Sequence, residues 1–151
     1  MISVYLAGPS EMQSEIREFR DYLYSKWSHM FKVTAKWLDQ ELDLEFLTGE
    51  IIDKQINDIY NAIQESSIFV IFELPQWHGR GTGGRHVELG LALSSKFTKI
   101  IVVGIINNVF HLAPRIKRIP AMSMEDPNLF DEIKKEIEAC YNDLHNWAAE
   151  N

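Results

Sequence analysis

The chain has a single cysteine, no long apolar run and a deficit of basic residues. Cys140 is the only cysteine among 151 residues, so no disulfide can form within the chain, as is usual in a reducing compartment. No apolar run approaches the roughly 20 residues that span a bilayer, and an apolar segment begins at Ile2 with no basic stretch before it. We therefore expect a cytoplasmic protein that does not bind membranes.

Acidic residues outnumber basic ones, 22 against 15, which gives a formal net charge of -7. Binding to a phosphate backbone requires clustered Lys and Arg, so the charge argues against nucleic acid as a partner and favours a small ligand. His78, His86 and His111 do not have the spacing of metal ligands, and no cysteine pair accompanies them. We therefore assign no metal and no cofactor.

Strand and helix patterns alternate along the chain, and 46% of its residues are hydrophobic. The expected strands are residues 2–7, 31–38, 67–74 and 99–104, with a short edge strand at 115–119. Helices are expected from Ser10 (apolar face Ile16, Phe19, Leu23 and Trp27), through the stripe Ile52, Ile56, Ile59 and Ile63, after the glycines at 81–84, and from Asp126 (face Leu129, Ile133, Ile137, Leu144 and Trp147). Residues 39–45 are acidic and predict a solvated loop. This order predicts a single α/β domain over residues 1–151, a doubly wound (Rossmann-like) parallel sheet with helices on both faces.

The segment from Gly81 to Gly90 follows the buried strand at 67–74 and contains Glu88. A glycine-rich turn before a helix offers backbone N–H groups and a positive dipole end to a ligand. We expect Glu88 in the first turn of this helix, with a lowered pKa that keeps it ionised at neutral pH. Tyr5, Gly8 and Ser10 follow or end the first strand and should lie at the same edge of the sheet.

Four motifs occur in order: Tyr5-Leu6-Ala7-Gly8-Pro9, Asn57-Asp58-Ile59, Gly84-Arg85-His86-Val87-Glu88-Leu89-Gly90 and Asn108-Val109-Phe110-His111. Together they resemble the nucleoside 2-deoxyribosyltransferase family, whose relatives include 2'-deoxynucleoside 5'-phosphate N-hydrolases. In contrast to the transferase pattern, five residues separate Gly81-Thr82 from Glu88. Transfer and hydrolysis therefore both remain open.

The resemblance implies a role for each matching residue. Glu88 matches the nucleophile, Tyr5 the tyrosine that orients it, and Asp58 the aspartate near the departing base. Asn108 matches a residue lent by a neighbouring subunit, which implies a homodimer or higher homo-oligomer. The remaining candidate substrate-binding residues are those of the two glycine-containing turns: Gly8, Pro9, Ser10, Gly83, Gly84, Arg85 and His86.

Cleavage of a deoxyribose N-glycosidic bond passes through an oxocarbenium-like centre, which a carboxylate can stabilise and then trap as a glycosyl ester. We therefore expect Glu88 to cleave 2'-deoxynucleosides or their 5'-monophosphates, with transfer of the sugar to a second base or to water. Asp58 is the candidate that assists the leaving base. Each residue has another interpretation: Glu88 as a solvated acid at a helix start, Asp58 as a surface charge and Tyr5 as a core tyrosine.

A non-catalytic nucleotide-binding or sensing module is the alternative, because it would use the same turn and helix start for phosphate. It would not require Glu88, Asp58 and Tyr5 together. If the ligand has an anionic 5' group, we expect Ser10, Gly83, Gly84 and Arg85 to hold it, since a chain of net charge -7 must offset its own field there. A pairing of Arg85 with a surface acid is the other interpretation.

Overall fold

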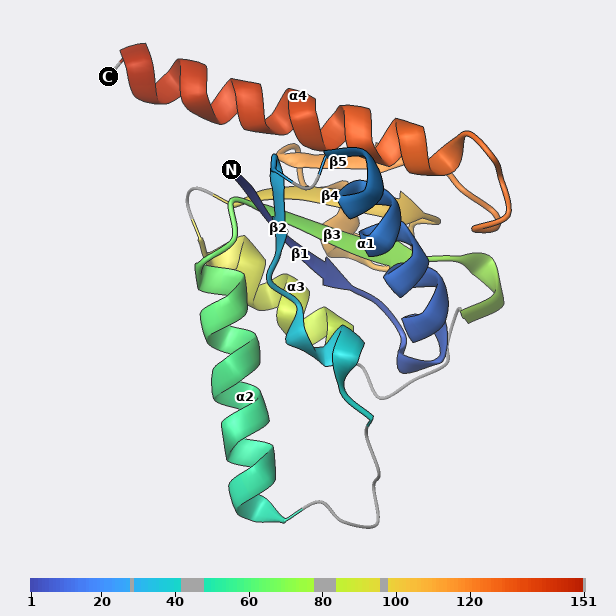
Figure 1. The fold of residues 1–151 in the computed structure, drawn as a ribbon, viewed down its shortest axis with the longest axis vertical. Helices are drawn as coiled ribbons and strands as arrows, with labels where there is room; N and C mark the ends of the chain where they lie inside the picture. The colour runs from blue at the N-terminus through green and yellow to red at the C-terminus, as the bar shows by residue number, and fades with distance from the viewer. Residues whose placement is uncertain (28, 42–47, 78–83, 96–97, 151) are drawn as a thin grey trace.

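The structure, a computed structural model, describes residues 1–27, 29–41, 48–77, 84–95 and 98–150. These residues form a parallel five-stranded sheet in the order β2-β1-β3-β4-β5 (Figure 1). The strands are β1 (Ile2–Ala7), β2 (Phe31–Val33), β3 (Ile68–Glu73), β4 (Lys99–Gly104) and β5 (Ile116–Ile119). The expected α/β fold class is therefore confirmed, and the fifth strand lies at the edge of the sheet as expected.

Helices cover both faces of the sheet (Figure 1). One face carries α1 (Gln13–Trp27) and α4 (Leu129–Glu150), which meet where Phe19 packs edge-on against Phe72 and Phe130. The other face carries α2 (Gly49–Gln64) and α3 (Gly84–Ser94). Every residue of the central strand β3 is buried, which explains its continuous apolar sequence, since a strand covered on both faces has no solvated side.

The strand order places a topological switch between β1 and β3. From β1 the chain crosses to β2 on one side, and from β3 it continues to β4 on the other. Ligands of doubly wound sheets bind in the crevice beyond the carboxyl ends of the strands at such a point. The ends of β1 and β3, at Ala7 and Glu73, therefore mark where a site is expected in this fold.

Three predicted boundaries were wrong. The 3-10 turn η1 (Ser10–Met12) precedes α1, and β2 ends at Val33 before a second 3-10 turn, η2 (Lys36–Asp39). The last helix begins at Leu129 rather than Asp126, because the Asp126 carboxylate accepts the backbone N–H of Asn128 at 2.9 Å and forms a turn. These shifts leave the topology unchanged, but residues 36–38, expected in a strand, belong to the turn η2, and Lys36 and Trp37 of that turn line a pocket.

The apolar stripe predicted for α2 is buried only near its carboxyl end. Ile63 is fully buried, whereas Ile52 and Ile56 are 41% and 58% exposed. Figure 1 shows the reason: the amino-terminal half of α2 extends past the sheet. In the last helix, Leu129, Ile133 and Ile137 are buried as expected.

Within the described residues, no helix is both long enough and apolar enough to cross a membrane.

Candidate active site

Two of the three predicted catalytic residues are in direct contact. The Tyr5 hydroxyl donates a hydrogen bond to Oε1 of Glu88 at 2.7 Å, across 83 residues of sequence. Tyr5 is fully buried on β1, and its ring stacks on Phe69 of β3 with centroids 5.6 Å apart. The stacked ring fixes the direction of the hydroxyl, so the sheet itself holds the tyrosine against α3.

The ionisation of Glu88 differs from the prediction. Glu88 is the fifth residue of α3, beyond the first turn, so it is farther from the helix dipole than the sequence suggested. Burial raises the pKa of Glu88 to about 7, and the hydrogen bond from Tyr5 opposes that rise only in part. The expectation of a lowered pKa was therefore wrong: desolvation outweighs both the helix end and the hydroxyl. Burial and the nearby carboxylate also raise the pKa of Tyr5, which keeps its hydroxyl protonated as a donor.

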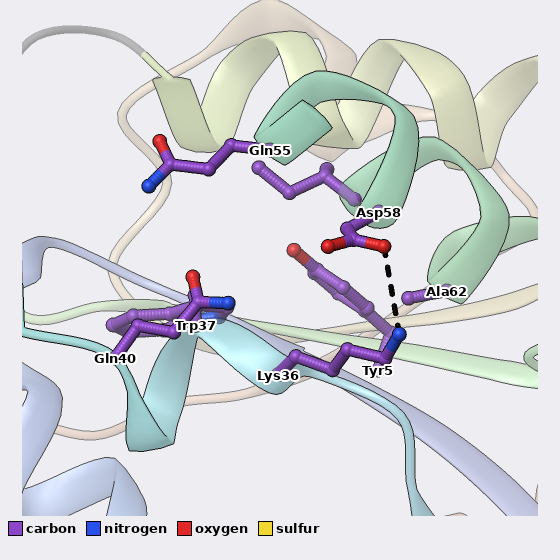
Figure 2. A pocket seen from close by; sticks show the side chains of 8 residues that line it. Tyr5, Lys36, Trp37, Gln40, Gln55, Asp58 and Ala62 are labelled. Atoms are coloured by element: carbon purple, nitrogen blue, oxygen red, sulfur yellow. Dashed lines mark hydrogen bonds and ion pairs between the residues drawn. The ribbon is translucent and has the colours of Figure 1, made fainter. Parts of the chain in front are cut away.

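A pocket lies beside the Tyr5 ring (Figure 2). Its walls come from η2 after β2 and from α2, and Tyr5 is the strand residue that lines it. The lining residues are Tyr5, Lys36, Trp37, Gln40, Gln55, Asp58, Ile59 and Ala62. Tyr5 thus belongs to the pocket and contacts Glu88 at the same time.

Asp58 reaches this pocket from α2, and Lys36 lies opposite it. The Lys36 ammonium is 3.5 Å from Oδ1 of Asp58, an ion pair drawn in Figure 2. The Lys36 side chain is 66% exposed, so the pair is solvated and contributes little to stability. Both charges nevertheless face the same small volume as the Tyr5 ring, where they can donate to or accept from a ring-shaped ligand.

The η2 wall is fixed by three hydrogen bonds. The indole N–H of Trp37 donates to the carbonyl of Leu6 at 2.8 Å, which ties η2 to the end of β1. The Gln13 amide of α1 donates to the carbonyls of Trp37 and Gln40 at 2.7 and 2.8 Å. Because these backbone groups are satisfied from two directions, the wall is preorganised.

The first glycine-containing turn serves packing in this structure. A Cβ at Gly8 would overlap the Ile16 side chain, so glycine allows α1 to approach the sheet closely. Pro9 is buried, and the exposed Ser10 hydroxyl donates to Glu11 at 3.1 Å. Gly84 is the exposed first residue of α3, while Gly83 lies outside the described residues. Substrate binding by these residues stays a prediction.

Arg85 is buried rather than presented at the surface. Its Nε donates to both carboxylate oxygens of Glu73, at 3.0 and 3.1 Å, and both side chains are nearly inaccessible to water. Asn107 donates a further hydrogen bond to Glu73 at 2.5 Å. The structure therefore matches the interpretation in which Arg85 pairs with an acid of the protein, except that this acid is buried.

His86 and Asn108 lie near the same edge of the sheet as Glu73. Nδ1 of His86 is 3.8 Å from Oε1 of Glu73, and the two imidazole rings of His86 and His111 are 6.5 Å apart. Asn108 caps the 3-10 turn η5 (Val109–Leu112), where its side chain accepts the backbone N–H of Phe110 at 2.8 Å. The part of Asn108 in a neighbouring subunit's site stays a prediction.

The sequence interpretation missed Lys36, Trp37, Gln40 and Gln55. The first three follow β2, which pairs with β1, so the rule that ligands bind at carboxyl ends applied to them as well. The overlong second strand concealed Lys36 and Trp37, and Gln40 fell in the segment expected to be a solvated loop. Gln55 lies one helical turn before Asp58, and this spacing was the available signal.

Comparisons with known proteins agree with this fold. Neither a protein-family model nor a curated protein matches the sequence. Among solved structures, the CMP N-glycosidase BcmB of Clostridium botulinum matches with a TM-score of 0.53 and 16% identity, over 87% of this chain and 98% of that one. At this identity the likeness shows a shared fold, and the resemblance drawn from the motifs is confirmed at that level.

Proposed function

We propose that this protein is an enzyme that cleaves the N-glycosidic bond of 2'-deoxynucleosides or their 5'-monophosphates. The observation that carries the proposal is the 2.7 Å hydrogen bond from Tyr5 to Glu88 beside a pocket lined by Asp58. It joins three chemical groups that a nucleotide-binding module does not require. The fold shared with a CMP N-glycosidase supports the same class of reaction.

In the proposed mechanism, Oε2 of Glu88 attacks the anomeric carbon while the Tyr5 hydroxyl holds Oε1. The bond from the sugar carbon to the base nitrogen breaks as the bond to the carboxylate forms, through an oxocarbenium-like transition state. The departing base lies in the pocket, where the Asp58–Lys36 pair supplies a hydrogen bond or proton to its ring. Water or a second base then displaces Glu88, with overall retention of configuration.

The pocket geometry supports this placement of the base. Trp37 offers an aromatic surface, and Gln40 and Gln55 offer amides that can donate and accept along the edge of a base. We assign the pocket to the base and the space beside the Glu88 carboxylate to the sugar.

The decisive experiment is incubation with a panel of deoxynucleosides, deoxynucleoside 5'-monophosphates and CMP, followed by chromatography for free base. CMP is included because the structural neighbour's name contains it. A faster reaction of the 5'-monophosphates would support the anionic 5' site predicted from the sequence. Binding of a nucleotide without release of base would favour the non-catalytic module instead.

The same assay with an excess of a second free base distinguishes transfer from hydrolysis. Formation of a new nucleoside identifies a transferase. Release of free deoxyribose or its phosphate identifies a hydrolase.

A further inference from the structure

A second group of side chains with donor atoms lies at the carboxyl end of the sheet, apart from the pocket. It consists of Glu73 at the end of β3, His86 in α3 and His111 in η5. One donor atom from each residue lies within 4.8 Å of the others. These residues are far apart in sequence, so the fold alone brings them together.

The His111 side chain is buried and makes no hydrogen bond within the described residues. Neither of its ring nitrogens has a partner there. The same holds for Nδ1 of His86, which faces Glu73 at 3.8 Å, too far for a hydrogen bond. A buried polar atom without a partner costs about 1–3 kcal/mol, so an unpartnered nitrogen from each of the two histidines beside one carboxylate points to a missing ligand.

Two neighbouring side chains hold the Glu73 carboxylate in place by hydrogen bonds. Arg85 donates to both oxygens of Glu73, and Asn107 donates to Oε2. Oε1 still faces His86. Hydrogen-bond donors behind a ligating carboxylate are usual in metal sites, where they fix its orientation.

We propose that Glu73, His86 and His111 bind one divalent transition-metal ion, with zinc as the best fit. Two imidazole nitrogens and one carboxylate oxygen form the donor set of three-ligand zinc sites, which leave one position for water or another ligand. The present separations exceed those of a bound set, so the two rings must close in by small rotations. We assigned no metal from the sequence because these three ligands show no regular spacing.

The charge of Arg85 decides which ion binds. The guanidinium offsets the charge of Glu73, so the site offers little net negative charge to a cation. Magnesium and calcium depend on carboxylates and other oxygen ligands, whereas zinc, cobalt and nickel bind well to imidazole. The site therefore selects transition metals, with an affinity below that of closed, cysteine-rich zinc sites.

Zinc binding to tag-free protein after treatment with a chelator tests this assignment. We expect one zinc or cobalt ion per chain by calorimetry and elemental analysis, and no binding of magnesium or calcium at the same concentrations. Zinc should also raise the Tm, because it binds only the folded chain. Cobalt provides an absorption spectrum that reports imidazole ligation independently of any enzymatic activity.

The variants are His86→Gln and His111→Gln, with His29→Gln as the matched control. His29 is an exposed histidine outside the cluster. Each cluster variant should weaken zinc binding by more than the tenfold loss, roughly, that follows removal of an outer partner, and should abolish the rise in Tm. Because His111 is buried, its variant is first checked for folding by circular dichroism. His86 is 34% exposed, so its variant provides the test if His111→Gln does not fold.

Two results would overturn the proposal. One is the absence of stoichiometric zinc uptake by the wild-type protein. The other is equal zinc affinity in the wild-type protein and a folded His86→Gln protein. Neither result tests the role of Glu88 in glycosidic cleavage, which the base-release assay measures separately.

Discussion

The Tyr5 hydroxyl and the Glu88 carboxylate form a hydrogen bond of 2.7 Å between the central sheet and α3. This contact lowers the pKa of Glu88, while burial raises it more strongly, to about 7. At neutral pH the Glu88 carboxyl group is therefore present in both its protonated and its ionised form. A group in that state can act as a nucleophile once ionised and is sensitive to any change in its surroundings.

Replacement of Glu88 by glutamine should abolish base release and preserve the fold. The amide cannot form the glycosyl ester, and its shape matches the carboxyl group, so no cavity is created. Chromatographic assays of base release, together with circular dichroism, provide the measurement. Glu18→Gln on the exposed side of α1 is the matched control. Undiminished turnover by a folded Glu88→Gln protein would exclude Glu88 as the nucleophile.

The same substitution should change how stability depends on pH. The folded protein binds the Glu88 proton more tightly than the unfolded chain does, because its pKa rises from 4.5 to about 7. The stabilising contribution is therefore complete below about pH 4.5 and is lost as pH rises through 7, at a cost on the order of 2 kcal/mol. Urea unfolding at pH 5 and pH 8 should show a smaller loss of stability in Glu88→Gln than in the wild type. Equal losses in both would mean that Glu88 is solvated.

Replacement of Tyr5 by phenylalanine should lower kcat/KM by about ten- to hundredfold, because a hydrogen bond to a charged group contributes about 1.5–3 kcal/mol. The ring still stacks on Phe69, so the core is preserved. Loss of the donor also raises the pKa of Glu88 further, which moves the ascending limb of the pH–rate profile to higher pH. Tyr141→Phe on α4 is the control. An unshifted pH profile would assign Tyr5 a purely structural role.

The order of strands and helices was predictable because the apolar pattern of most segments matches their burial. The continuous apolar run of β3 indicated a strand covered on both faces, and all of its residues are buried. The stripe on α2 was misleading for a physical reason: periodicity reports which face is apolar, not what covers it. Nothing in the pattern could tell that Ile52 and Ile56 extend beyond the sheet.

The contact between Tyr5 and Glu88 was predictable, whereas the ionisation of Glu88 was not. The pairing of Tyr5 with Glu88 was implied by the family resemblance, and the rule that strand ends meet at one edge placed both residues near the same pocket. The ionisation of Glu88 depends on how much water surrounds the carboxylate, which no sequence pattern reports. The partner of Arg85 was likewise hidden, because Glu73 closes a strand of apolar residues and only the fold turns it inward.

Asp58→Asn should slow the release of ordinary bases by about a hundredfold or more, the range of general acid–base catalysis. The same variant should lose much less activity on a deoxyriboside whose leaving group departs without protonation, such as a nitrophenol. That difference separates assistance of the leaving group from a general loss of binding. Asp53→Asn is a matched control on the exposed part of α2. Equal losses on both substrates would contradict the assignment.

Removal of either partner of the buried Arg85–Glu73 pair should destabilise the protein by about 3–5 kcal/mol, because the remaining charge is left in the interior. Arg85→Met and Glu73→Gln should each lower the Tm, and the double variant should recover part of that loss. Thermal unfolding of all four proteins gives the coupling free energy. A mild effect of Arg85→Met alone would indicate that Glu73 is solvated or neutral without its partner.

The exposed apolar residues of α2 predict at least a symmetric dimer. Ile51, Ile52, Ile56 and Tyr60 are each more than 40% exposed, on the helix that also carries Asp58 of the pocket. The resemblance implies that a neighbouring subunit contributes to the site, and a second copy bearing the same apolar surface is a self-complementary partner. Sedimentation should therefore give twice the chain mass for the wild type. Ile56→Asp should shift it to monomer with reduced base release, while Ser25→Asp on α1, on the opposite face of the sheet, should change neither. A fully active wild-type monomer at assay concentration would refute the dimer.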